Sequence, residues 1–125
     1  MNTAHYTFVG AGLLFFIIFL TGYWLSKSGR PLNGIVLTIH KLIALAAGLS
    51  LVVTAYQTHR VATLSTIELV VALVTGLLFL GTGIAGGLLS TDKPMPGAIS
   101  WTHRITPFLT ALSTAMTLYL LLSRK

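Results

Sequence analysis

Nearly the whole chain consists of four apolar stretches, each close to the length that a helix needs to cross a membrane. An α-helix requires about 20 apolar residues to span the hydrocarbon of a bilayer. We expect helices at about 6–26, 34–57, 65–90 and 98–122 of the 125 residues. Short connections make neighbouring helices antiparallel. The sequence therefore predicts an all-α integral membrane protein, an up-down-up-down four-helix bundle forming a single transmembrane domain over residues 1–125.

The connections between the expected helices contain turn-forming or polar residues. They lie at 28–31, 57–60 and 92–97. The first apolar stretch has no basic segment before it and no Ala-x-Ala site near its end, so we expect a retained span rather than a cleaved signal.

The composition narrows the chemistry that such a protein can carry. Only 8% of the residues are charged, which is too few to cover a water-facing surface, so the expected surroundings are a lipid bilayer. The chain has no cysteine, which excludes disulfides, thiolate metal sites, iron–sulfur clusters and covalently attached haem. Histidine is then the strong transition-metal ligand that remains. The net charge of +6 lies at segment ends rather than on one face, which argues against a nucleic-acid partner.

An internal repeat relates the two halves of the chain at an offset of 63 positions. The repeat units are about 1–62 and 64–125. They are most similar over 27 aligned positions, of which seven are identical. The identical pairs are Pro31 and Pro94, Gly34 and Gly97, His40 and His103, Leu49 and Leu112, Ser50 and Ser113, Thr54 and Thr117, and Tyr56 and Tyr119. Two copies of a helix pair would be related by a pseudo-twofold axis along the membrane normal.

The repeat selects two of the four histidines. His40 and His103 each lie six residues after the glycine at the start of an expected helix. Because these two helices run in the same direction, both rings lie about 9 Å inside the same edge of a hydrocarbon core about 30 Å thick. Polar rings at that depth are costly and usually functional, and a matched pair suggests a shared ligand.

The residues that follow each histidine on its own helical face are mostly small or compact. They are Ala44, Ala47, Gly48 and Leu51 after His40, and Pro107, Thr110, Ala111 and Thr114 after His103. A flat macrocycle that lies between two helices needs helix faces with small side chains. The third stretch adds Gly76, Gly81, Gly83, Gly86 and Gly87, which would let its backbone approach a cofactor or another helix closely.

A cation follows each histidine directly, Lys41 in one repeat and Arg104 in the other. Both could pair with the propionates of a haem. The pattern predicts one non-covalent haem b with His40 and His103 as axial ligands of the iron. The predicted contacts with the macrocycle come from Lys41, Arg104, Ala44, Ala47, Gly48, Pro107, Thr110 and Ala111. Two histidine ligands fill the iron, so the expected chemistry is one-electron transfer.

With this histidine pair, its following cations and its small neighbours, the chain resembles small four-helix membrane b-type cytochromes, including the quinone-linked bacterial cytochrome b families. The resemblance is architectural and covers the whole chain. It implies haem b, a location in the bacterial inner membrane, and electron exchange with quinones or partner redox subunits. Many members hold two haems, whereas one matched histidine pair predicts a single haem here.

Other functions remain open on the sequence alone. One is a cofactor-free accessory subunit of a membrane complex, whose histidines bond to backbone or lipid headgroups. Another is a pigment-binding protein or a small transporter, although the scarcity of intramembrane acids argues against a cation path. His5 and His59 have no counterpart in the other repeat, and we expect both to be solvated at the membrane surface.

Overall fold

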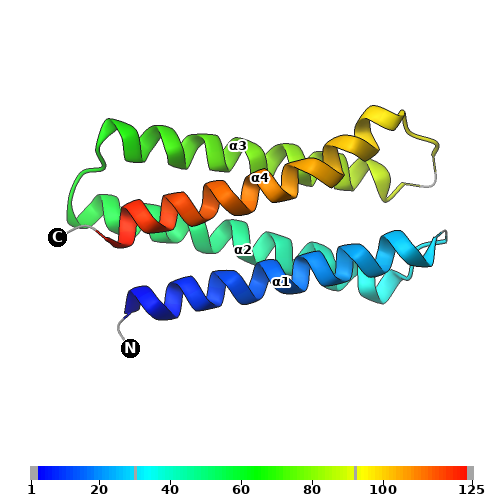
Figure 1. The fold of residues 1–125 in the computed structure, drawn as a ribbon, viewed down its shortest axis with the longest axis horizontal. Helices are drawn as coiled ribbons and strands as arrows, with labels where there is room; N and C mark the ends of the chain where they lie inside the picture. Colours follow the sequence, from blue (N-terminus) through cyan, green and yellow to red (C-terminus); the bar gives the residue numbers. More distant parts are fainter. Residues whose placement is uncertain (1–2, 30, 92, 124–125) are drawn as a thin grey trace. The chain divides into compact units, whose positions relative to one another are not determined.

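The computed structural model describes residues 3–29, 31–91 and 93–123, which form four α-helices joined by short turns (Figure 1). The helices are α1 (Thr3–Ser28), α2 (Gly34–Val61), α3 (Thr66–Leu89) and α4 (Gly97–Leu122). All four are long and apolar enough to cross a membrane. The predicted all-α class and four-helix membrane architecture are therefore confirmed, and the fold is compatible with a multi-pass integral membrane protein.

The turn between α1 and α2 has a clear cause at each end. Gly29 follows the last residue of α1 with a φ of +69°, a left-handed conformation that commonly ends helices and suits a residue without Cβ. Asn33 then caps α2, because its side-chain Oδ1 accepts hydrogen bonds from the backbone N–H groups of Ile35 at 2.9 Å and Val36 at 3.1 Å. Gly29 ends α1 and Asn33 begins α2, so the first turn contains only a few residues.

The second connection lies further along the chain than predicted. We expected α2 to end at 57 and residues 57–60 to form the turn, but α2 continues to Val61. The segment is polar but contains neither glycine nor proline, so nothing in it breaks a helix that reaches the membrane surface. The turn is set instead by a capping box at the start of α3. Glu68 N–H donates to Ser65 Oγ at 3.2 Å, and Ser65 N–H donates to Glu68 Oε1 at 3.0 Å.

The chain divides into two compact units, residues 1–50 and 51–125. The first contains α1 and the first part of α2, and the second contains the last turns of α2 with α3 and α4. Within each unit successive helices run antiparallel (Figure 1). The expected repeats meet in the α2–α3 turn, whereas the two units divide within α2.

The second unit packs α3 against α4 largely through hydroxyl groups. Thr75 is fully buried, and its hydroxyl donates to the Val71 carbonyl at 2.8 Å. The same oxygen is hydrogen-bonded to the Ser113 and Thr117 hydroxyls, the latter at 2.9 Å. Hydrogen bonds between polar side chains are a normal means of joining helices in a membrane, where leucine packing gains nothing from excluding water. Threonine therefore takes the place that large apolar residues occupy in the core of a soluble bundle.

Two turns away along α3, Thr82 repeats this arrangement. Its hydroxyl donates to Thr106 Oγ1 at 2.8 Å and lies 3.4 Å from Thr110 Oγ1. Many large apolar side chains instead lie outside, as Leu77 and Leu112 do at 68% and 70% exposed, although Leu118 and Leu121 are buried. Apolar exposure on this scale suits a lipid environment and would be a liability in water.

Candidate functional site

His103 lies six residues into α4, and its ring contacts α3. The Nδ1 atom is 3.0 Å from the backbone carbonyl oxygen of Thr82. A carbonyl oxygen carries no hydrogen, so Nδ1 must be the donor in this bond. When the ring is neutral, its lone pair therefore lies on Nε2. Histidines that bind metals commonly donate their other ring N–H to such an acceptor, which fixes both tautomer and orientation.

Gly86 makes room for this ring. A Cβ atom at Gly86 would lie 2.6 Å from His103 Cε1 and 3.1 Å from His103 Nδ1. The first separation is shorter than real Cβ contacts, and the second is tight, so a side chain at this position would displace the histidine. Glycine at 86 is therefore part of the histidine site.

His40 lies six residues into α2, and its ring contacts α1 in a similar way. The Nδ1 atom is 2.8 Å from Thr21 Oγ1. The same hydroxyl lies 2.8 Å from the carbonyl oxygen of Ile17 and 3.1 Å from that of Ile18, and it can donate its one hydrogen only toward these acceptors or toward His40. With the hydrogen directed to the α1 carbonyls, as is usual for threonine in a helix, Oγ1 accepts from His40 Nδ1–H. The lone pair of the neutral His40 ring then also lies on Nε2.

A glycine accommodates the His40 ring as well. A Cβ atom at Gly22 would lie 3.2 Å from His40 Cε1. In both units, then, a histidine on the second helix of a pair packs over a glycine of the preceding helix, with its Nδ1 hydrogen-bonded to that helix. At the offset of 63 positions, however, Gly22 does not align with Gly86, and Thr21 does not align with Thr82.

The remaining predicted site residues differ in exposure. Lys41 and Arg104 are exposed; Ala44, Gly48, Pro107 and Ala111 are half-buried; Ala47 and Thr110 are buried. The hydroxyl of Thr110 donates to the Thr106 carbonyl at 2.7 Å and lies near Thr82, so this side chain contacts α3. His40 and its neighbours belong to the first unit, and His103 and its neighbours belong to the second.

The other two histidines lie at the ends of helices. His5, near the start of α1, and His59, in the last turn of α2, are exposed. The Leu64 N–H donates to His59 Nδ1 at 3.4 Å, a contact that closes the end of α2. Within the described ranges, no three or more histidine, aspartate or glutamate side chains gather as a metal site.

The glycines of α3 divide into two groups. Gly86 contacts His103, whereas a Cβ at Gly76, Gly81, Gly83 or Gly87 would meet no atom within 4 Å. The close approach expected from this glycine-rich helix therefore occurs, among these five positions, at Gly86.

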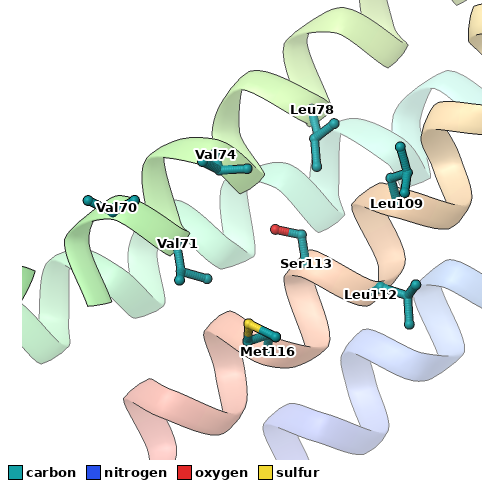
Figure 2. A pocket seen from close by; sticks show the side chains of 8 residues that line it. All are labelled: Val70, Val71, Val74, Leu78, Leu109, Leu112, Ser113 and Met116. Carbon is teal, nitrogen blue, oxygen red and sulfur yellow. The ribbon is translucent and has the colours of Figure 1, made fainter. Parts of the chain in front are cut away.

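A shallow apolar groove of about 490 Å³ lies between α3 and α4 (Figure 2). It is lined by Val70, Val71, Val74, Leu78, Leu109, Leu112, Ser113 and Met116. Ser113 supplies the one polar side chain in this lining, and no histidine or carboxylate contributes to it. The groove suits hydrocarbon and is chemically distinct from the histidine sites.

Of the four residues that hold the two rings, sequence reasoning named only Gly86. Thr21 and Gly22 lie on α1, and Thr82 and Gly86 lie on α3. In the sequence, a threonine lies close to a glycine on the helix before each histidine, and this pattern could have indicated the contacts of the ring. Its meaning depends on how the two helices are rotated about their axes, which the sequence pattern does not specify.

Comparison of the chain with protein-family models, with curated proteins and with solved structures gives no match. Function is therefore inferred from the chemistry of the two histidines and their contacts.

Proposed function

We propose that this protein is a membrane b-type cytochrome in which His40 and His103 are the axial ligands of one non-covalently bound haem. The supporting observation is the Nδ1 hydrogen bond of each ring to the preceding helix. In the tautomer that these bonds favour, Nε2 carries the lone pair that iron requires. Both histidines are half-buried in helices long and apolar enough to span a membrane, where polar rings are rarely kept without a function.

The donor set and its surroundings suit this cofactor. Two neutral imidazoles are a common ligand set for electron-transfer haems, and the absence of cysteine agrees with non-covalent attachment. Lys41 and Arg104 are exposed directly after the two ligands, where they would pair with the propionates. Ala44, Gly48 and Ala111 present little side-chain bulk beside the rings. One histidine pair provides for one haem.

A haem with two histidine ligands supplies one-electron transfer and leaves no open iron position for oxygen. The protein's own residues would bind the group and fix the ligand tautomers. We propose a quinone or a partner redox subunit as the electron donor or acceptor, in a bacterial inner membrane and within a larger complex. These partners follow from the resemblance to quinone-linked cytochromes b.

Haem titration into detergent-purified protein tests the proposal. The wild type should take up one haem per chain and give the spectrum of low-spin iron with two histidine ligands. The variants His40→Ala and His103→Ala should each lose that spectrum, whereas His59→Ala, which removes an exposed histidine at the end of α2, should retain it. Failure of the wild type to bind haem, or loss of haem in His59→Ala alone, would overturn the proposal.

A cofactor-free accessory subunit is the second candidate, and one observation favours it. Each histidine ring already hydrogen-bonds to the preceding helix and packs over a glycine, an arrangement that also joins two helices without any ligand. In that case the wild type would bind no haem. His103→Ala would then lower the free energy of unfolding of the protein without any change in its spectrum.

A further inference from the structure

The two histidines are held by acceptors of different kinds. The acceptor for His103 is the backbone carbonyl of Thr82, which no side-chain substitution removes. The partner of His40 is the side-chain hydroxyl of Thr21, and a hydroxyl can either accept or donate. The group that faces Nδ1 of His40 is therefore a side chain, whereas the group that faces Nδ1 of His103 is backbone.

The contacts of Thr21 favour one of its two roles. Its hydroxyl lies 2.8 Å from the Ile17 carbonyl and 3.1 Å from the Ile18 carbonyl, so its hydrogen has two acceptors on α1 that cannot themselves donate. When the hydroxyl donates to them, its oxygen accepts from His40 Nδ1–H. Hydrogen bonds linked in this way polarise one another, so the carbonyl contacts also make Thr21 Oγ1 a better acceptor.

We infer that Thr21 is the positioning residue for His40: its hydroxyl holds the ring in the tautomer that places the lone pair on Nε2, and it thereby sets the strength of His40 as an iron ligand. The inference about ligand strength rests on the proposed haem function, whereas the inference about the tautomer concerns this chain alone. A hydrogen-bonded Nδ1–H makes the imidazole more basic and a stronger donor to ferric iron. Thr21 therefore stabilises the oxidised form of the site.

Valine has nearly the shape of threonine but cannot accept a hydrogen bond. In Thr21→Val the Nδ1–H of His40 would lose its acceptor, and the ring would gain freedom to carry its hydrogen on Nε2. Thr21→Ser keeps the hydroxyl. Thr7→Val is the matched control, because Thr7 also lies on α1 and its hydroxyl donates to the Thr3 carbonyl at 3.0 Å, far along the helix from Thr21.

The tautomer can be measured without haem. Nitrogen-15 NMR of histidine-labelled protein in detergent, at a pH where the rings are neutral, distinguishes a protonated ring nitrogen from one that carries a lone pair. We expect His40 to be protonated on Nδ1 in the wild type, in Thr21→Ser and in Thr7→Val, and to shift toward protonation on Nε2 in Thr21→Val. Protonation of His40 on Nε2 in the wild type, or no shift in Thr21→Val, would overturn the inference.

The haem-loaded protein gives the second readout. Loss of a hydrogen bond to a ligating histidine typically weakens metal binding about 10–100-fold. Thr21→Val should weaken haem binding by that order and raise the reduction potential, while Thr21→Ser and Thr7→Val stay close to the wild type. If the wild type binds haem and Thr21→Val matches Thr7→Val in affinity and potential, the assignment of Thr21 is wrong and the haem proposal stands. If the wild type binds no haem, the proposed function is wrong, and the NMR result alone decides the role of Thr21.

Discussion

His103 Nδ1 and the carbonyl oxygen of Thr82 are 3.0 Å apart, which joins α4 to α3 through the ring of a histidine rather than through an apolar side chain. The ring fits there because Gly86, one turn further along α3, has no Cβ. The hydrogen bond between His103 and Thr82 defines the tautomer of His103 and fixes where its ring lies. The first prediction concerns the space that Gly86 leaves.

Gly86→Ala should displace the His103 ring. The added Cβ would lie 2.6 Å from Cε1, and overpacking of this kind typically costs about 1–3 kcal/mol. We expect a lower free energy of unfolding in mixed micelles and weaker haem binding, despite the better helix propensity of alanine. Gly22→Ala should have a smaller effect on His40, because its Cβ would lie 3.2 Å from the ring.

Gly87→Ala is the matched control for Gly86→Ala. A Cβ at this neighbouring position would meet no atom within 4 Å. The substitution should leave haem binding unchanged and stabilise the helix by up to about 1 kcal/mol. Equal effects of the alanine substitutions at 86 and 87 would show that the contact between Gly86 and His103 does not exist.

Thr75→Val should destabilise the pairing of α3 with α4. The Thr75 hydroxyl is fully buried and bonds with Ser113 and Thr117 on α4. Hydrogen bonds between membrane helices contribute about 0.6 kcal/mol on average and up to about 2 kcal/mol. The expected loss in the free energy of unfolding is of that size. It can be measured by denaturation in mixed micelles, with the exposed Thr38→Val as the control.

Thr114→Val should behave in the opposite way. Thr114 is only 4% exposed, and its hydroxyl has no hydrogen-bond partner among the described residues. Replacing an unpaired buried hydroxyl with a methyl group removes an unfavourable burial, so stability should stay the same or rise. A loss as large as that of Thr75→Val, measured in the same denaturation experiment, would show that Thr114 has a partner.

Ser65→Ala should loosen the start of α3. The substitution removes the side chain that caps the helix and accepts from the Glu68 N–H. Loss of such a cap typically costs about 1 kcal/mol. Hydrogen exchange should become faster in the first turn of α3 and stay unchanged in α4. Unchanged exchange in the first turn of α3 would contradict the role of the capping box.

The sequence allowed the helices to be predicted because membrane spans are specified by length and apolar composition. Three of the four expected helices begin and end within about three residues of their observed limits, and the turn at Gly29 follows from local chemistry. The end of α2 was predicted four residues too early, because polar residues such as Thr58 and Arg60 were interpreted as a turn. Polar residues at a membrane surface can remain helical, and it was the capping box of Ser65 that marked the boundary.

The site was predicted less completely than the fold. The repeat singled out His40 and His103, but not the groups that hold them. The acceptors Thr21 and Thr82 differ in kind, and they do not correspond at the offset of 63 positions. Which residues of a preceding helix meet a ring depends on helix rotation and packing, and apolar periodicity is nearly uninformative where all faces of a helix are apolar.

The difference spectrum between dithionite-reduced and oxidised protein, recorded after purification with haem supplied, tests the central claim most directly. The wild type and His59→Ala should show the reducible bands of a haem with two histidine ligands. His40→Ala and His103→Ala should each lose them. A wild-type protein without reducible haem bands, or a His40→Ala or His103→Ala variant that keeps the wild-type spectrum, would contradict the assignment of His40 and His103 as the haem ligands.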